Sequence, residues 1–208
     1  SETLEGHTRE VLAAAETLLH TSGPDSLRAF GLPAGASPRL SRIVLLASFL
    51  HDLGKSSDHF QQMMRHQRSA PQLVRHEALS LWLAWPGQPL AEWLSGAVST
   101  RADYFLALIA AAGHHRKFTS GAVAVRDSGA GTQVRLLTGH DDFQRLTELA
   151  KAKFSLPPLP ALPDEIVVSA TRRSHPGETL VRFEEEWNDA RVCIGEEKRL
   201  LALCKALI

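Results

Sequence analysis

The chain has 208 residues, of which 44% are hydrophobic, and this composition supports a substantial core and excludes an intrinsically disordered protein. Its length, together with the absence of a composition shift or a long linker, favours a single domain over residues 1–208. Lysine and arginine number 23, as do aspartate and glutamate, which excludes a basic field over the whole molecule; a nucleic-acid contact must therefore come from a local patch.

The beginning of the chain predicts a helix followed by a loop. Residues 3–20 place apolar side chains at spacings of three, four and seven, the pattern of an amphipathic helix, and His7 falls on the apolar stripe. Residues 21–40 are rich in glycine and proline, which predicts a loop with at most one short helical turn.

A buried central helix is predicted from Ser41 to Gly54. Ser41 is a favourable N-cap, the run that follows is almost wholly apolar, and Gly54 stands where helices commonly stop. The longest apolar stretch, residues 43–50, is far below the roughly 20 residues that span a bilayer, and the acidic N-terminus lacks a signal-peptide core. We therefore expect a cytoplasmic protein without a membrane partner.

The remaining sequence predicts more helices and one small β-structure. Residues 122–138 contain two short runs with β-branched residues around a Ser-Gly-Ala-Gly turn, which predicts a surface hairpin. Residues 156–163 hold four prolines and must be extended. The predicted fold class is mainly α, a helical bundle with a small β-hairpin excursion. Helices are expected from about residue 56, over 73–85, 89–99, 102–112 and 141–152, and at the end of the chain, where Cys193 and Cys204 are expected to be reduced core residues.

Ten histidines stand out in the composition, because histidine is the commonest metal ligand. His51 and Asp52 are adjacent at a helix end, where a fraying terminus lets both side chains turn toward one centre. Taken singly, a histidine on an apolar stripe is more often a hydrogen-bonded core residue, but the joint pattern predicts a metal site. Its expected members are His7, His51, Asp52, His76, His114 and His115, whereas His20, His59, His66, His140 and His175 stand in polar or loop surroundings and are assigned to solvent.

The ordered motifs carry a family resemblance. HDLGK at 51–55 is followed by Phe60-Gln61, RHE at 75–77 and GHH at 113–115, after an N-terminal helix that contains His7. This series, which extends over nearly the whole chain, resembles the HD nuclease domain of the CRISPR-associated helicase-nuclease that degrades target DNA in type I interference. The resemblance implies an all-helical HD-domain bundle, two divalent ions and single-stranded DNA as the substrate. The residue chemistry favours Mn, Fe, Co or Ni, with Mg and Zn as alternatives.

The resemblance also implies a division of ligands between the two ions. His7, His51 and Asp52 would serve one ion, and Asp52, His76, His114 and His115 the other. The family pattern ends with a late aspartate, and the last nine residues here contain no acid, so the chain is expected to end just before that motif. Asp189 is the nearest upstream alternative, but its context predicts a solvated helix face.

Further partners follow from the same resemblance. Helicase motifs, including the glycine-rich phosphate loop, are absent, so the chain is expected to be a separate nuclease subunit or a fragment of a longer protein. A helicase domain or subunit and the CRISPR RNA-guided surveillance complex are the implied partners.

The expected mechanism is activation of water by two metal ions for attack on a phosphodiester. Asp52 and Lys55 are the predicted catalytic residues, with Lys55 reaching a nonbridging phosphate oxygen as a point charge; a solvated loop lysine is the alternative. Basic residues close to the ligands would line a groove for the DNA backbone, although solvation is the commoner fate of such side chains. These residues are Arg65, Arg75, Arg116 and Lys117.

Two other functions compete with the nuclease. An HD phosphohydrolase acting on a small nucleotide would use the same metals in a closed pocket. A catalytically silent module that docks a helicase or ribonucleoprotein would keep metal only for structure. Turnover on DNA compared with nucleotides, and its dependence on added metal, separate the three.

Overall fold

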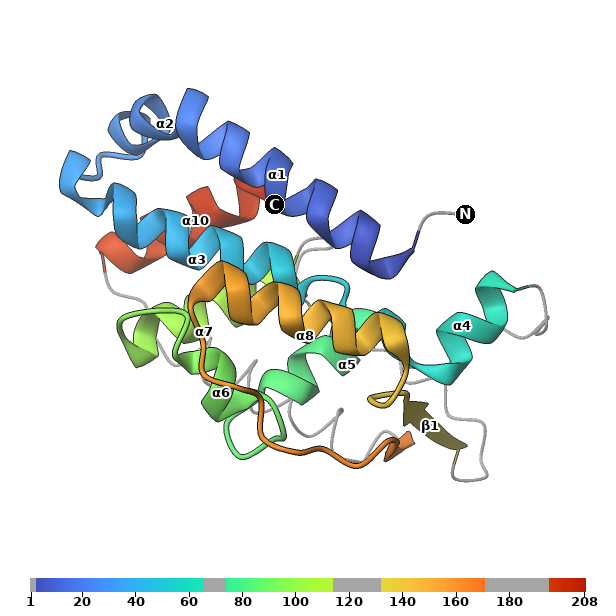
Figure 1. Cartoon of the computed structure of the whole chain (residues 1–208). Helices are drawn as coiled ribbons and strands as arrows, with labels where there is room; N and C mark the ends of the chain where they lie inside the picture. The colour runs from blue at the N-terminus through green and yellow to red at the C-terminus, as the bar shows by residue number, and fades with distance from the viewer. Residues whose placement is uncertain (1–2, 66–73, 114–131, 171–194) are drawn as a thin grey trace.

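The computed structural model describes residues 3–65, 74–113, 132–170 and 195–208, and within these ranges the chain is a helical bundle with one small sheet (Figure 1). Helix α3 packs against α1, α7 and α10, while α8 lies against α1 and α5 packs against α7. The helices are α1 (Leu4–Thr21), α2 (Gly23–Ala29), α3 (Ser37–Leu50), α4 (Asp58–Met64), α5 (His76–Ala84), α6 (Ala91–Ser95), α7 (Arg101–Ala112), α8 (Asp141–Phe154) and α10 (Glu196–Leu207), with 3₁₀ turns η1 (Ala34–Ala36) and η2 (Leu53–Ser56).

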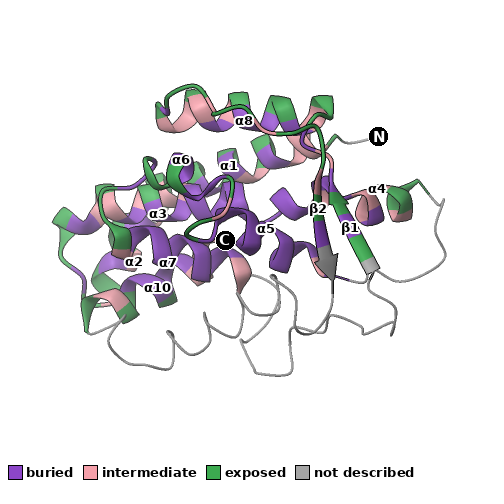
Figure 2. Cartoon of the chain, turned by 90° about the horizontal axis from the view of Figure 1, so that it is seen from below, coloured by how far each residue is buried: buried purple, intermediate pink, exposed green. Residues whose placement is uncertain are grey.

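The central helix α3 forms the middle of the core, as its apolar sequence predicts. Ile43, Val44 and Leu46 have no exposed surface, and α5 and α7 are also buried along most of their length (Figure 2). The described residues form a helical bundle with one small sheet, so the predicted mainly α fold class is confirmed.

No helix in the described ranges is both long enough and apolar enough to cross a membrane.

The glycine- and proline-rich segment 21–40 is more helical than predicted. It contains α2 and η1, and α3 begins at Ser37 instead of Ser41. Pro24 and Pro38 occupy the first turns of α2 and α3, where the missing amide proton costs nothing and the fixed φ favours the helix. These prolines therefore begin helices, and the loop prediction was wrong in this respect.

The small sheet pairs strands that are distant in sequence. Strand β1 (Thr132–Leu136) is the second run of the predicted hairpin, but its described partner is β2 (Ile166–Ala170), antiparallel to it with Leu136 opposite Ile166. The first run, at 122–131, lies outside the described residues. Strand β1 also contacts the region next to the HD motif, because Leu136 bridges Ser57 and the amide of Leu137 donates to the carbonyl of Ser56 at 3.1 Å.

Several local predictions can be compared directly with the structure. Ser57 caps α4 through a bond from the amide of Phe60 at 3.4 Å, and α10 contains Cys204, which is free and buried as expected. Cys193 lies outside the described residues.

His20 and His140 are exposed, but His59 is buried, so its assignment to solvent was wrong. Helix α4 contacts β1, and the side chain of Asp58, next to His59, accepts a hydrogen bond from the backbone amide of Arg135.

Candidate metal centre

The adjacent side chains of His51 and Asp52 turn toward each other because the helix ends between them. His51 is the C-cap of α3 and keeps helical dihedrals, whereas Asp52 has φ −114° and ψ 5° and leads into η2. The break brings His51 Nε2 to 3.1 Å from Asp52 Oδ2. Asp52 is 1% exposed, so its carboxylate is a buried charge at a helix end and requires partners.

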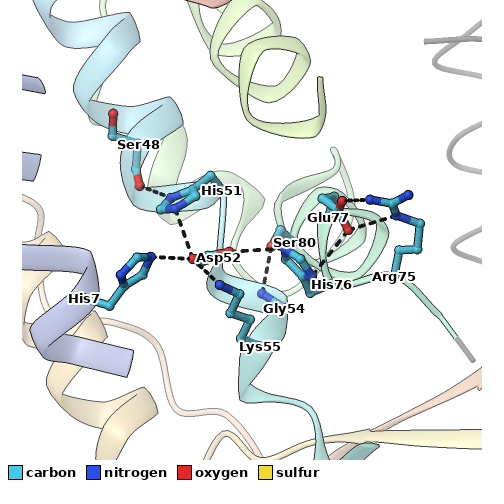
Figure 3. Close-up of polar contacts among 10 residues, drawn as sticks. All are labelled: His7, Ser48, His51, Asp52, Gly54, Lys55, Arg75, His76, Glu77 and Ser80. Carbon is cyan, nitrogen blue, oxygen red and sulfur yellow. Dashed lines mark hydrogen bonds and ion pairs between the residues drawn. The ribbon is translucent and has the colours of Figure 1, made fainter. Parts of the chain in front are cut away.

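Four side chains surround this carboxylate, each from a different element (Figure 3). Asp52 Oδ2 lies 2.9 Å from His7 Nε2 of α1 and 2.6 Å from Lys55 Nζ of η2, in addition to His51. Its other oxygen, Oδ1, lies 3.2 Å from His76 Nε2 at the start of α5. The two carboxylate oxygens therefore face two different groups of nitrogen donors.

The ring of His51 is oriented by a contact on its far side. Its Nδ1 lies 2.6 Å from the carbonyl oxygen of Ser48 in the preceding turn. A carbonyl can only accept, so Nδ1 carries a proton, and Nε2 is the nitrogen left to bind a cation beside Asp52. Outer contacts of this kind commonly orient histidines that bind metals.

His76 is held by the packing of η2 against α5. A Cβ built on Gly54 would lie 2.0 Å from the carbonyl oxygen of His76, so only glycine permits this approach. The amide of Gly54 donates to Ser80 Oγ at 2.7 Å, which ties the two elements together. On the outer side of the ring, His76 Nδ1 faces Glu77 Oε2 at 3.4 Å.

Electrostatics keep the central carboxylate ionised. Burial raises the pKa of Asp52, but hydrogen bonds from His51 and His76 and the nearby positive charges outweigh this and hold its pKa well below the usual range. Burial likewise raises the pKa of Glu77, but the hydrogen bonds and positive charge of Arg75 help to bring the net value below normal. The centre thus contains ionised carboxylates at neutral pH.

The donor set suits a divalent cation. The ligand atoms of His7, His51 and Asp52 all lie within 4.8 Å of one another, which brings two imidazoles and one carboxylate oxygen within reach of a single ion. Imidazole and carboxylate together favour first-row divalent metals. The side chains present here therefore fit the metal that the HD motif implies.

The other predicted site residues fall into three groups. His114, His115, Arg116 and Lys117 lie outside the described residues. Arg65 is exposed at the end of α4, and Arg75 is half-buried and paired with Glu77.

Sequence reasoning missed the contacts of Ser48, Ser80 and Glu77. The single available signal was that Glu77 follows His76 in the RHE motif. Phe60, which was quoted only as part of the motif, lies 5.8 Å from the His76 ring and 5.5 Å from Lys55 Nζ, measured to ring centroids.

A helical bundle in which a His-Asp pair at a helix end meets histidines from two other helices has the architecture of an HD domain. The family model "Cas3, HD domain" matches residues 2–180, and the chain belongs to this family. Over 206 residues the chain is 50% identical to a CRISPR-associated nuclease/helicase Cas3 of Myxococcus xanthus, in an alignment that covers 99% of this chain. The chain spans 28% of the length of that relative.

Proposed function

We propose that the chain is a metal-dependent nuclease that hydrolyses phosphodiester bonds of single-stranded DNA in type I CRISPR interference, in the cytoplasm of a prokaryote. The observation that carries this proposal is the buried Asp52 carboxylate, whose Oδ2 faces the imidazoles of His7 and His51 while its Oδ1 faces that of His76. A carboxylate in this position is suited to bridge two cations. Membership of the Cas3 HD family supports the CRISPR assignment.

In this proposal the ligands divide around Asp52. His7, His51 and Asp52 would hold one divalent ion, and Asp52, His76, His114 and His115 would hold the second. When bound, such ions would supply an activated water nucleophile and would offset charge on the leaving oxygen. Ser48 keeps His51 in the tautomer that donates its Nε2 lone pair.

Lys55 supplies a mobile positive charge for the substrate phosphate. Its ammonium now lies 2.6 Å from Asp52 Oδ2, and its long flexible side chain is partly exposed. Because four rotatable bonds let that ammonium reach other positions, Lys55 would pair with a nonbridging phosphate oxygen of the bound substrate. Arg65, Arg75, Arg116 and Lys117 are the proposed contacts with the DNA backbone.

The proposed partners are a helicase domain or subunit and the RNA-guided surveillance complex. The Myxococcus xanthus relative is named as a nuclease and a helicase in one protein, and this chain aligns with 28% of it. A helicase that delivers single strands would supply the substrate that we propose for this centre.

The test compares turnover on single-stranded DNA, a mononucleotide and a cyclic dinucleotide, each with Mn²⁺, Co²⁺, Ni²⁺ or chelator. We expect metal-dependent cleavage of the DNA, loss of cleavage with chelator, and little turnover of the small substrates. Faster hydrolysis of a nucleotide would instead identify a phosphohydrolase. Metal binding without turnover of any substrate would identify a docking module.

A further inference from the structure

The ring of His76 has a carboxylate on each side. Its Nε2 lies 3.2 Å from Asp52 Oδ1, and its Nδ1 lies 3.4 Å from Glu77 Oε2. The Glu77 side chain is 8% exposed, which is unusual for a glutamate, and it points toward the ring instead of toward solvent (Figure 3). A buried carboxylate beside a candidate metal ligand requires an explanation.

Arg75 fixes the direction in which Glu77 points. Its Nη2 donates to Glu77 Oε1, and its Nε donates to Oε2 at 3.3 Å. Arg75 can make both bonds because it is the N-cap residue of α5, where its extended backbone lets the side chain fold over the first helical turn. A guanidinium that engages both oxygens of a carboxylate restricts it to one orientation.

The arrangement at His76 repeats the arrangement at His51. In both rings Nε2 faces Asp52, and in both Nδ1 faces an oxygen that can accept a proton: the Ser48 carbonyl at 2.6 Å for His51 and Glu77 Oε2 for His76. An imidazole that binds a cation through Nε2 must keep its one N–H on Nδ1, and in both rings an acceptor oxygen is in place for that proton. Two histidines from different helices thus present the same nitrogen to the same carboxylate.

We propose that Glu77 is a positioning residue, which holds the proton of His76 on Nδ1 and aims Nε2 at the ion shared with Asp52. This inference rests on the proposed function, because it assigns a role within the same centre. Arg75 acts through Glu77 by fixing its carboxylate. Neither Arg75 nor Glu77 touches the ion in this scheme.

The test measures metal affinity and the tautomer of His76 separately. Calorimetric titration of Mn²⁺ into the metal-free chain should give a 10–100-fold weaker affinity of one ion for Glu77→Ala, the usual effect of losing such an outer contact. Glu77→Gln retains one acceptor oxygen and should lose less. In the metal-free chain Asp52 and Glu77 each offer an acceptor to the His76 ring, so in ¹⁵N NMR spectra Glu77→Ala should lower the protonation of Nδ1 relative to the wild type and shift the proton toward Nε2.

A matched control is available in α6. Glu92 is also an acidic residue in a first helical turn, but it is exposed, and Glu92→Ala should change neither the affinity nor the tautomer. If Glu77→Ala does not fold, the double variant Arg75→Met, Glu77→Leu removes both charges while roughly keeping the volume, a replacement that buried ion pairs often tolerate. It should show the same loss of affinity, with circular dichroism confirming its helices.

The outcomes distinguish this inference from the proposed function. Wild-type protein that binds no Mn²⁺ would overturn the proposed function and this inference with it. Wild-type metal binding and cleavage, with unchanged affinity and an unchanged His76 tautomer in a folded Glu77 variant, would overturn the positioning role alone.

Discussion

Asp52 is the residue on which the whole centre depends, because it contacts side chains from α1, α3, η2 and α5. We therefore predict that Asp52→Ala abolishes metal-dependent DNA cleavage while the helical fold persists. Cleavage assays with Mn²⁺ and far-UV circular dichroism test this. Asp25→Ala is the control, since Asp25 is an exposed aspartate in another helix, and it should cleave at the wild-type rate. Wild-type cleavage by Asp52→Ala would contradict the two-ion proposal.

Lys55 should affect the rate of cleavage and not the binding of metal. Its ammonium competes with cations for Asp52 Oδ2, so Lys55→Ala should retain bound metal while cleavage slows by about 10- to 100-fold, the range typical of a lost charge-assisted contact. Metal stoichiometry and single-turnover rates provide the measurement. Lys151→Ala serves as the control, because Lys151 is a partly exposed lysine of α8 that pairs with Glu148. An equal loss of metal and activity in Lys55→Ala would show that its assigned role is wrong.

The buried thiol of Cys204 should resist modification. Burial and the nearby Asp103 charge raise its pKa to about 12, despite the opposing charge of Arg39. Because the folded pKa lies above the unfolded value of about 8.5, the stability that this thiol contributes is complete below that pH and falls as the pH rises toward 12. A Cys193→Ser variant should react with a thiol reagent at pH 8 only after unfolding in guanidinium. Rapid labelling of the native protein would contradict the burial of α10.

At the residue scale, the sequence named the histidines that the structure gathers around Asp52, and it missed the side chains that contact them on their outer sides. His7, His51, Asp52 and His76 could be found because each stands at a helix end or on an apolar stripe. The contacts of Ser48 and Glu77 depend on backbone dihedrals and side-chain directions, which residue spacing does not encode. His59 was misassigned for a related reason, since its burial depends on contacts between α4 and β1.

At the element scale, local patterns predicted helices well and pairing poorly. The apolar run of α3 and the Ser57 cap of α4 are local features, and both are present in the structure. The pairing of β1 with β2 joins segments separated by all of α8, and no local signal specifies such a partner. Pro24 and Pro38 gave an ambiguous signal for secondary structure, because proline is common both after the end of a helix and in its first turn.

The close packing of η2 on α5 makes Gly54 irreplaceable. In Gly54→Ala the new Cβ would lie 2.0 Å from His76 O and 2.8 Å from Leu79 Cβ, so the elements must separate. We predict a loss of about 1–3 kcal/mol in the free energy of unfolding, as is typical for overpacking, together with weaker metal binding as His76 moves from Asp52. Guanidinium denaturation and calorimetry test both effects.

The control for this variant is Gly35→Ala, because Gly35 is exposed and a Cβ there would meet no atom within 4 Å. It should be neutral or stabilising by up to about 1 kcal/mol, since alanine restricts the unfolded chain. If the two variants were equally stable, the η2–α5 contact would not constrain the centre.

At the scale of the whole molecule, a buried ion pair joins the helices at the end of the bundle away from the metal centre. Arg39 of α3 donates to Asp103 of α7 at 2.6 Å and also pairs with Glu196 and Glu197 of α10 at 3.4 and 3.6 Å. Asp103 is 4% exposed, measured on its side chain. Segments far apart in the sequence thus meet at one guanidinium, a contact that no local sequence pattern predicts.

Removal of the charge at Asp103 should destabilise the fold without altering the metal centre. Asp103→Asn leaves Arg39 without its buried partner, and we predict a loss of about 3 kcal/mol, the lower end of the range for broken buried pairs because Arg39 is partly exposed. Arg39 and His51 are both carried by the α3 region and are about 18 Å apart along its axis, so Mn²⁺ affinity should stay at the wild-type value. Chemical denaturation measures the stability, and calorimetry measures the affinity.

The exposed Arg28–Asp25 pair provides the comparison, since Asp25→Asn should cost less than about 1 kcal/mol of folding stability. Equal losses in the two variants would show that the Arg39 cluster does not hold the bundle together.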